Sequence, residues 1–351
     1  MKKNQFLKVF FVSIFAIGFL LTTTPVYSGP TVLRWAHPSP KRGFEPEHFD
    51  WIKKELETRT NGRVTIEVFW GGALAEFKEM AEAVKSGMAD VGWISAAYHQ
   101  GYGELAGVAH ATSLFNPEPD TVEYMKKFYA MFEDSPAFYD DFKTDNMVPI
   151  SLIYYDEYWI FSKKPIKSIA DFKGVKIRGI SEGRQVAMKE WGASPVFIGA
   201  GEMYSALEKN IIDAVEYSPD TAKRYNIHEI TKYVTKAGFQ PGVAYWCINL
   251  EKFKSLSETD RKTLMAVGRE AAMLKAAWMG QERDGALKTF KEKGLGILEI
   301  SKDDKIQMDN SPEYKAYATK WVNEKESKGL PAKKALNLYC DVFAVGNPMK
   351  Q

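Results

Sequence analysis

Residues 168–178 read Ser-Ile-Ala-Asp-Phe-Lys-Gly-Val-Lys-Ile-Arg, and residues 201–219 read Gly-Glu-Met-Tyr-Ser-Ala-Leu-Glu-Lys-Asn-Ile-Ile-Asp-Ala-Val-Glu-Tyr-Ser-Pro. The segment 175–177 predicts a short strand that ends at Arg178, where the chain turns at Gly179. Open α/β sheets bind ligands at the carboxyl ends of their strands. A planar guanidinium at that place suits a carboxylate. The alternative is a surface arginine that pairs with a nearby glutamate.

The segment 213–217, Asp-Ala-Val-Glu-Tyr, closes the next apolar strand of the same unit. By the same rule about strand ends, Glu216 is expected beside Arg178. There it either holds the guanidinium in place or joins a bound cation. The alternative is that Glu216 pairs with a surface lysine.

The chain has 351 residues, which suits two domains better than one core. Its first 28 residues have the layout of a secretory signal peptide, in which Lys2, Lys3 and Lys8 precede the apolar run 9–21 and cleavage is expected before Gly29. An uncleaved membrane anchor is the alternative, although this run is short against the ~20 residues of a membrane span.

Removal of the three leader lysines changes the formal charge from 47 − 45 = +2 to 44 − 45 = −1. Because the mature chain is near neutral and has no basic run, no nucleic-acid partner is expected. Cys247 and Cys340 either form one disulfide in an oxidising compartment or remain two buried thiols. They are too few for a cysteine zinc site.

Strands and helices alternate through the first half of the chain. Strands are predicted at 31–36, 63–70 and 90–94, and helices at 47–58, 77–86 and 121–142, the last capped by Asp120. This order implies parallel pairing through crossovers. The extended aromatic segment 148–161 exceeds an average strand, so we expect it to cross from one domain to the other.

A second unit of the same kind follows, and a long helix comes after it. Strands are predicted at 175–178, 194–198, 211–217, 243–249 and 295–300, an extended segment at 233–235, and helices at 182–191, 202–210, 221–225 and 257–293, with a helical tail at 311–344 broken at 329–331. The strand 243–249 is the expected return crossing, and the helix 257–293 would be about 50 Å long and run along both domains.

These elements give the predicted domain organisation. Residues 1–28 are the signal peptide. The first domain consists of 29–155 with 244–283. The second consists of 156–243 with 284–351, including the helical tail.

The sequence lacks the motifs of several enzyme classes. It has no Gly-x-Ser-x-Gly nucleophile elbow, its five histidines show no metal-ligand spacing, and it has no glycine-rich phosphate loop. These absences argue against those enzyme classes, a metal enzyme included.

Aromatic residues surround Asp156 and Glu157 in the segment 154–159. On a strand, its aromatic and polar side chains fall on both faces, which is unusual for a core strand. The pattern suits a segment that crosses a ligand cleft. The alternative is an edge strand with one solvated face.

Several motifs resemble the periplasmic solute-binding proteins of TRAP transporters, the DctP family. They are Asp171-Phe-Lys-Gly-Val-Lys-Ile-Arg178, Gly192-Ala-Ser-Pro195, Gly201-Glu-Met-Tyr-Ser-Ala-Leu207, Ile212-Asp-Ala-Val-Glu216, Thr60-Asn-Gly-Arg-Val-Thr-Ile66 and Ala83-Val-Lys-Ser-Gly-Met-Ala-Asp-Val-Gly92. The resemblance spans about residues 31–300 and keeps the spacing between motifs.

The resemblance implies an α/β, two-domain periplasmic binding protein fold with hinge strands and a long helix spanning both domains. It implies that Arg178 pairs with the carboxylate of a small organic acid, such as a dicarboxylate, keto acid, sugar acid or aromatic acid. It also implies a binding protein that is not an enzyme and carries no cofactor, and that works in the periplasm and delivers the acid to TRAP membrane subunits. Two alternatives on the same fold are a ligand sensor that docks on a receptor and a secreted enzyme.

The family pattern also implies which residues face the cleft. Besides Arg178 they are Tyr158, Tyr217, Ser95, Tyr98, Glu216, His37 and Phe77. Sialic-acid binders have an arginine at the place of Tyr158 and an asparagine near Tyr217, and an aromatic residue often found in the family is here Ala200, so sialic acid is not expected. The tyrosines favour an aromatic or medium-sized acid over a C4 dicarboxylate. The segment 213–217 resembles keto-acid and hydroxy-acid binders, some of which hold a metal cation, and this places the expected cation beside Glu216.

Overall fold

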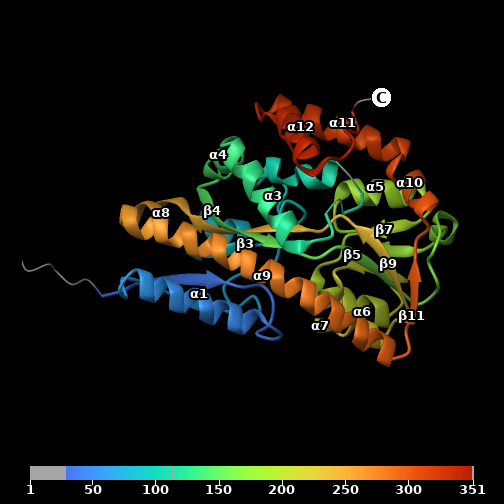
Figure 1. Cartoon of the computed structure of the whole chain (residues 1–351), viewed down its shortest axis with the longest axis horizontal. Coiled ribbons are helices and arrows are strands. Elements are labelled where there is room, and N and C mark those ends of the chain that lie inside the picture. Colours follow the sequence, from blue (N-terminus) through green and yellow to red (C-terminus); the bar gives the residue numbers. More distant parts are fainter. Residues whose placement is uncertain (1–28, 113, 117, 350–351) are drawn as a thin grey trace, which may run out of the picture.

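The computed structural model describes residues 29–112, 114–116 and 118–349, so the predicted signal peptide lies outside the described residues. The described residues form two β-sheets, each with helices against it and a hydrophobic core of its own (Figure 1). The predicted α/β class with two lobes is confirmed. Within the described part of the chain, none of the helices combines the length and apolar character of a membrane span.

The strand order in the sheet of the first lobe is β2-β1-β3-β10-β4. Its strands are β1 (Thr31–Ala36), β2 (Val64–Phe69), β3 (Val91–Ile94), β4 (Met147–Tyr154) and β10 (Val243–Asn249). β1 pairs in parallel with β2 and β3, as the alternation of strands and helices predicts. β10 returns from the second lobe and runs antiparallel between β3 and β4.

Helices cover this sheet. They are α1 (Glu45–Arg59), α2 (Met80–Lys85), the 3₁₀ helix η1 (Glu104–Ala111), α3 (Thr121–Asp134), α4 (Ala137–Lys143) and α8 (Leu250–Ser255). The carboxylate of Asp120 caps α3 as predicted, since it accepts from the N–H groups of Val122 and Glu123 at 2.9 and 2.8 Å. The single helix predicted over 121–142 is wrong: it breaks before Pro136, because proline disfavours a helical residue before it.

The strand order in the second sheet is β11-β9-β5-β8-β6-β7. Its strands are β5 (Tyr158–Ser162), β6 (Lys176–Arg178), β7 (Ser194–Val196), β8 (Ala214–Tyr217), β9 (Tyr233–Phe239) and β11 (Gly296–Glu299). β7, β6 and β8 are parallel neighbours, and Arg178 at the end of β6 lies beside Val215 of β8. The carboxyl ends of β6 and β8 therefore meet at one edge of the sheet, as predicted.

Short helices connect these strands. They are η2 (Ile169–Phe172), α5 (Glu182–Glu190), η3 (Ala200–Glu202), α6 (Met203–Glu208), α7 (Pro219–Arg224), η4 (Ile227–Glu229) and α10 (Lys302–Asp309). Neither α10 nor α8 was predicted, since both are short and have few buried residues.

The lobes are joined by the β4–β5 connection, by the β9–β10 connection and by α9 (Glu258–Glu292), which runs along both of them (Figure 1). The predicted extended segment 148–161 is two strands, one in each sheet. Buried residues of α9 up to Met279 belong to the first core, and Ala286 and Phe290 belong to the second. Arg283 of α9 pairs with Asp156 of the β4–β5 connection at 3.0 Å. The predicted spanning helix is confirmed.

The helical tail consists of α11 (Pro312–Ser327) and α12 (Ala332–Phe343) and lies across both lobes (Figure 1). Tyr314 of α11 belongs to the second core, whereas Trp321 belongs to the first. The predicted second domain includes 284–351, but α12 lies in the core of the first lobe, because its apolar face packs on η1 and α3. Cys247 and Cys340 are buried thiols that do not form a disulfide.

Gly268 lies where α9 crosses β4, and a Cβ atom there would come within 2.0 Å of the Ile150 carbonyl oxygen. Because Gly268→Ala has to push the helix away from the sheet, we expect it to lower the free energy of unfolding in urea by about 3 kcal/mol. The control is Gly285→Ala on the same helix, where nothing lies within 4 Å. Alanine there should be neutral or stabilise by up to about 1 kcal/mol. Equal stability of the two variants would contradict the close approach.

Candidate functional site

Arg178 is fully buried at the carboxyl end of β6 and has a relative exposure of 0%. Its Nε donates to the Ile198 carbonyl at 2.8 Å, and its Nη1 donates to the Glu216 carbonyl at 3.0 Å. Its Nη2 donates to the Tyr98 hydroxyl, which belongs to the first lobe, at 3.0 Å. Two carbonyls of the second lobe therefore fix the plane of the guanidinium, and one phenol reaches it from the other lobe.

The Arg178 guanidinium has no carboxylate partner among the described side chains, because its three acceptors are neutral oxygens. Guanidinium carries five N–H groups, so one on each terminal nitrogen is still available. A buried cation without a counter-charge is costly, and a bidentate carboxylate removes that cost. This arrangement is suited to binding an organic anion.

The carboxylate of Glu216 binds a different arginine. It accepts from Nη1 of Arg184 at 2.7 Å and from the backbone N–H of Ile180 at 2.6 Å. The side chains of Arg184 and Glu216 are 2% and 0% exposed. The expected contact between Glu216 and Arg178 is thus made by the backbone carbonyl, while the carboxylate neutralises Arg184.

Arg184 was missed in the sequence. It lies in the first turn of α5, and its Nη2 also donates to the Gln240 carbonyl in the β9–β10 connection at 2.7 Å. A cation in the first turn opposes the helix dipole, which disfavours positive charge at that end. A positive charge in the first turn of a predicted helix, close after the strand-end Arg178, could therefore have indicated that Arg184 has a buried partner.

Aromatic rings surround the Arg178 guanidinium. Its Cζ atom lies 4.7 Å from the centre of the Tyr217 ring, and Tyr217 lies 5.4 Å from the ring of Tyr158. Tyr98 lies 5.5 Å from Phe77 between ring centres. Burial raises the pKa of Tyr158 and of Tyr217, so both phenols stay neutral hydrogen-bond donors. The structure therefore brings four of the predicted residues to Arg178 or to its neighbours.

Ser95 and His37 lie in the first lobe without contacting Arg178. The Ser95 hydroxyl donates to the Val243 carbonyl at 3.4 Å. The His37 ring lies 4.6 Å from that of Trp70, and its Nδ1 accepts from the N–H of Ser39 at 3.0 Å. Both predicted residues thus have partners within their own lobe.

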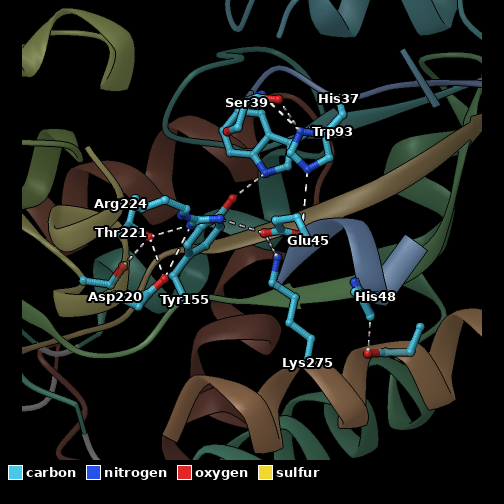
Figure 2. Close-up of polar contacts among 12 residues, drawn as sticks. His37, Ser39, Glu45, His48, Trp93, Tyr155, Asp220, Thr221, Arg224 and Lys275 are labelled. Atoms are coloured by element: carbon cyan, nitrogen blue, oxygen red, sulfur yellow. Dashed lines mark hydrogen bonds and ion pairs between the residues drawn. The ribbon is translucent and has the colours of Figure 1, made fainter. Parts of the chain in front are cut away.

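A second charged group, which the sequence did not reveal, lies between the lobes (Figure 2). Glu45 of α1 accepts through Oε1 from Lys275 of α9 at 2.9 Å and from Arg224 of α7 at 3.1 Å. Arg224 also pairs with Asp220 at 3.4 Å. We call Glu45, Asp220, Arg224 and Lys275 the Glu45 cluster. Burial alone would raise the pKa of Glu45, but the charges of Lys275 and Arg224 hold it well below its usual range.

Two of these contacts join the lobes. The Arg178–Tyr98 hydrogen bond and the Glu45–Arg224 ion pair each connect a side chain of the first lobe with one of the second. The lobes are therefore closed on each other around Arg178.

The described residues around Arg178 and Glu216 do not form a recognisable metal site. In the part of the chain that the structure describes, no three His, Cys, Asp or Glu side chains gather where they could hold a metal ion. Both carboxylate oxygens of Glu216 already accept from Ile180 and Arg184. A cation beside Glu216 stays a prediction.

A surface hollow of about 400 Å³ lies elsewhere, between η1 and α11. It is lined by residues of both lobes, including Tyr102, Ser181 and Tyr317, but by none of the eight predicted site residues. Its lysines, Lys320, Lys325 and Lys328, are paired with Glu182 and Glu104, whereas the three acceptors of Arg178 are neutral oxygens.

The sequence matches a known protein family and several curated relatives. Residues 37–320 match the family described as bacterial extracellular solute-binding protein, family 7 (DctP). A relative in Salmonella typhimurium, the uncharacterized protein YiiZ, is 24% identical over 302 residues, which cover 83% of this chain and 89% of that protein. The 2,3-diketo-L-gulonate-binding periplasmic protein YiaO of Escherichia coli is 24% identical over 247 residues, which cover 69% of this chain and 73% of that protein.

Solved structures share the fold. A TRAP periplasmic solute binding protein from Desulfovibrio salexigens with bound orotic acid superimposes with a TM-score of 0.78 at 22% identity, covering 89% of this chain and 98% of that one. A marine metagenome TRAP solute binding protein specific for aromatic acid ligands also gives 0.78, at 18% identity, covering 90% of this chain and 98% of that one.

We expect Glu216→Gln to destabilise the protein by about 3–5 kcal/mol, because it leaves the buried charge of Arg184 without a partner. Urea unfolding measures this loss. The double variant Glu216→Gln with Arg184→Met removes both charges and should recover most of the stability. Unchanged stability of the single variant, with loss of ligand affinity instead, would contradict the structural role of this pair.

Proposed function

The chain belongs to the family of bacterial extracellular solute-binding proteins, family 7, and we propose that it captures a carboxylate-bearing organic acid between its lobes and delivers it to the membrane subunits of a TRAP transporter. The observation that carries this proposal is the buried Arg178 guanidinium, which contacts only neutral acceptors among the described residues. A carboxylate supplies the missing counter-charge and accepts the two remaining N–H groups.

The relatives support this substrate class. YiaO is named for binding 2,3-diketo-L-gulonate, and the Desulfovibrio salexigens protein holds orotic acid. Each of these ligands carries a carboxyl group. The aromatic surroundings of Arg178, Tyr158 and Tyr217 give such an acid a low-dielectric site in which the ion pair is strong.

In the proposed cycle the acid first docks on Arg178 while the lobes are apart. Closure then brings Tyr98 onto the guanidinium and excludes water, which strengthens the ion pair. The carboxylate of Glu216, which lies with Arg178 at the strand ends, is already paired with Arg184 and so is not free to act as a base. Binding and release without chemistry is thus the proposed activity, and export by the leader 1–28 would place it in the periplasm.

The variant Arg178→Met tests whether Arg178 binds the carboxylate of the acid. A panel of organic acids is first screened for the acid that raises the melting temperature of the wild-type protein most, and its affinity is then measured by calorimetry. We expect the variant to bind that acid at least tenfold more weakly, since loss of one partner of a buried charge pair costs about 2–5 kcal/mol. Without ligand the variant should be as stable as the wild type or more stable, because an uncompensated buried charge is gone.

The matched control is Arg63→Met. Arg63 pairs with Asp260 at 2.7 Å within the first lobe and is 47% exposed. This substitution should leave the affinity for the acid unchanged. Equal affinities of the Arg178→Met variant and the wild-type protein would overturn the proposed anchor.

A further inference from the structure

The Glu45 cluster has buried polar atoms that remain unpaired. Oε2 of Glu45, Oδ1 of Asp220 and Nε of Arg224 make no hydrogen bond with any described residue. Glu45 and Asp220 are only 3% and 4% exposed. Unpaired buried polar atoms are costly, so the cluster has free capacity for a ligand that brings both donors and an acceptor.

His37 does not fill this capacity. Its Nδ1 lies 3.0 Å from the N–H nitrogen and 3.2 Å from the carbonyl oxygen of Ser39, and its Nε2 lies 3.9 Å from Oε2 of Glu45. That distance is too long for a hydrogen bond. Burial lowers the pKa of His37, so the ring is neutral and supplies no counter-charge.

An aromatic wall connects the cluster with Arg178. Tyr98, which binds the guanidinium, lies 5.2 Å from the ring of Trp93. Trp93 donates to the hydroxyl of Tyr155 at 2.9 Å, and Lys275 lies 5.7 Å from the centre of the Tyr155 ring. Figure 2 shows Trp93 and Tyr155 beside the cluster, with Arg224 directed at Glu45. A continuous run of aromatic side chains therefore links Arg178 with the Glu45 cluster.

Charges at the two ends differ. Arg178, Arg184 and Glu216 sum to +1 + 1 − 1 = +1 at the first end. Arg224, Lys275, Glu45 and Asp220 sum to +1 + 1 − 1 − 1 = 0 at the second. The group around Arg178 thus needs one negative charge to become neutral, whereas the Glu45 cluster is already neutral.

We propose that the Glu45 cluster is a second recognition site that binds hydroxyl groups, so that the solute is a hydroxylated monocarboxylate. This inference rests on the proposed function, because it assigns the far end of the acid that Arg178 holds. A hydroxyl group donates to a carboxylate oxygen of Glu45 or Asp220 and can accept from Nε of Arg224.

Other groups fit the cluster less well. A second carboxylate would face Glu45 and Asp220, and like charges that close repel each other. An ammonium group would add a charge to a neutral cluster that already holds Arg224 and Lys275. An apolar end would leave the buried oxygens unpaired, and sites built to bind hydroxyl groups reject analogues that lack them.

Acids of matched chain length test the proposal on the wild-type protein. Calorimetry compares four-carbon to six-carbon aldonates such as gluconate, the unsubstituted acids such as hexanoate, the amino acid 6-aminohexanoate, and the hydroxylated diacids such as glucarate. The best aldonate should bind at least tenfold more tightly than any member of the other three sets. An equal or better affinity for an unsubstituted, amino or dicarboxylic acid would overturn the proposal, as would the absence of binding by every aldonate.

Glu45→Gln gives a sharper test, because it changes the charge of the second end from 0 to +1. The variant should lose at least tenfold in affinity for the best aldonate and gain affinity for the diacid of the same length. A merely structural role of Glu45 would not produce this exchange of preference. The control Asp260→Asn breaks the Arg63–Asp260 pair inside the first lobe and should change neither affinity.

Asp220→Asn is the second variant, and it should likewise lose affinity for the aldonate and gain affinity for the diacid. It tests the proposal even if the Glu45→Gln variant does not fold. A loss of affinity that is equal for aldonates and diacids in both variants would overturn the inference. Failure here is distinguishable from failure of the proposed function. If Arg178→Met weakens every acid while hydroxyl groups make no difference, only the second site is wrong.

Discussion

The buried guanidinium of Arg178 is the constraint on which the chemistry of this protein depends. The carbonyls of Ile198 and Glu216 hold it at the end of β6, and Tyr98 reaches it from the opposite lobe. These acceptors fix its orientation but leave its charge uncompensated. In a dry environment an uncompensated charge is costly and interacts strongly with an anion, which is the physical basis of the carboxylate site that we propose.

A neighbouring arginine is neutralised within the protein. Arg184 is buried beside the same strand ends, yet Glu216 neutralises it at 2.7 Å. Glu216 therefore contributes its carbonyl to one arginine and its carboxylate to the other. One arginine is therefore neutralised within the fold, and the other contacts only neutral acceptors among the described residues. The Glu45 cluster repeats this balance between the lobes, where Arg224 and Lys275 offset two carboxylates.

Local patterns in the sequence predicted most of the architecture. The parallel pairing of β1 with β2 and β3 followed from alternating strands and helices, and the length of α9 followed from its uninterrupted helical pattern. The position of Arg178 at a strand end followed from one short apolar segment and the turn after it. Prediction failed where a single residue overrode the pattern, as Pro136 does between α3 and α4.

The sequence by itself thus determined the fold class, the two lobes and the position of Arg178 at a strand end, because each depends on neighbours along the chain. Only the tertiary structure decided which charges are neutralised. Lys275 and Glu45 are 230 positions apart, and α12 reaches the first core from the end of the chain. Whether a buried charge is paired depends on side chains that the folded path brings together, and no local pattern encodes that path.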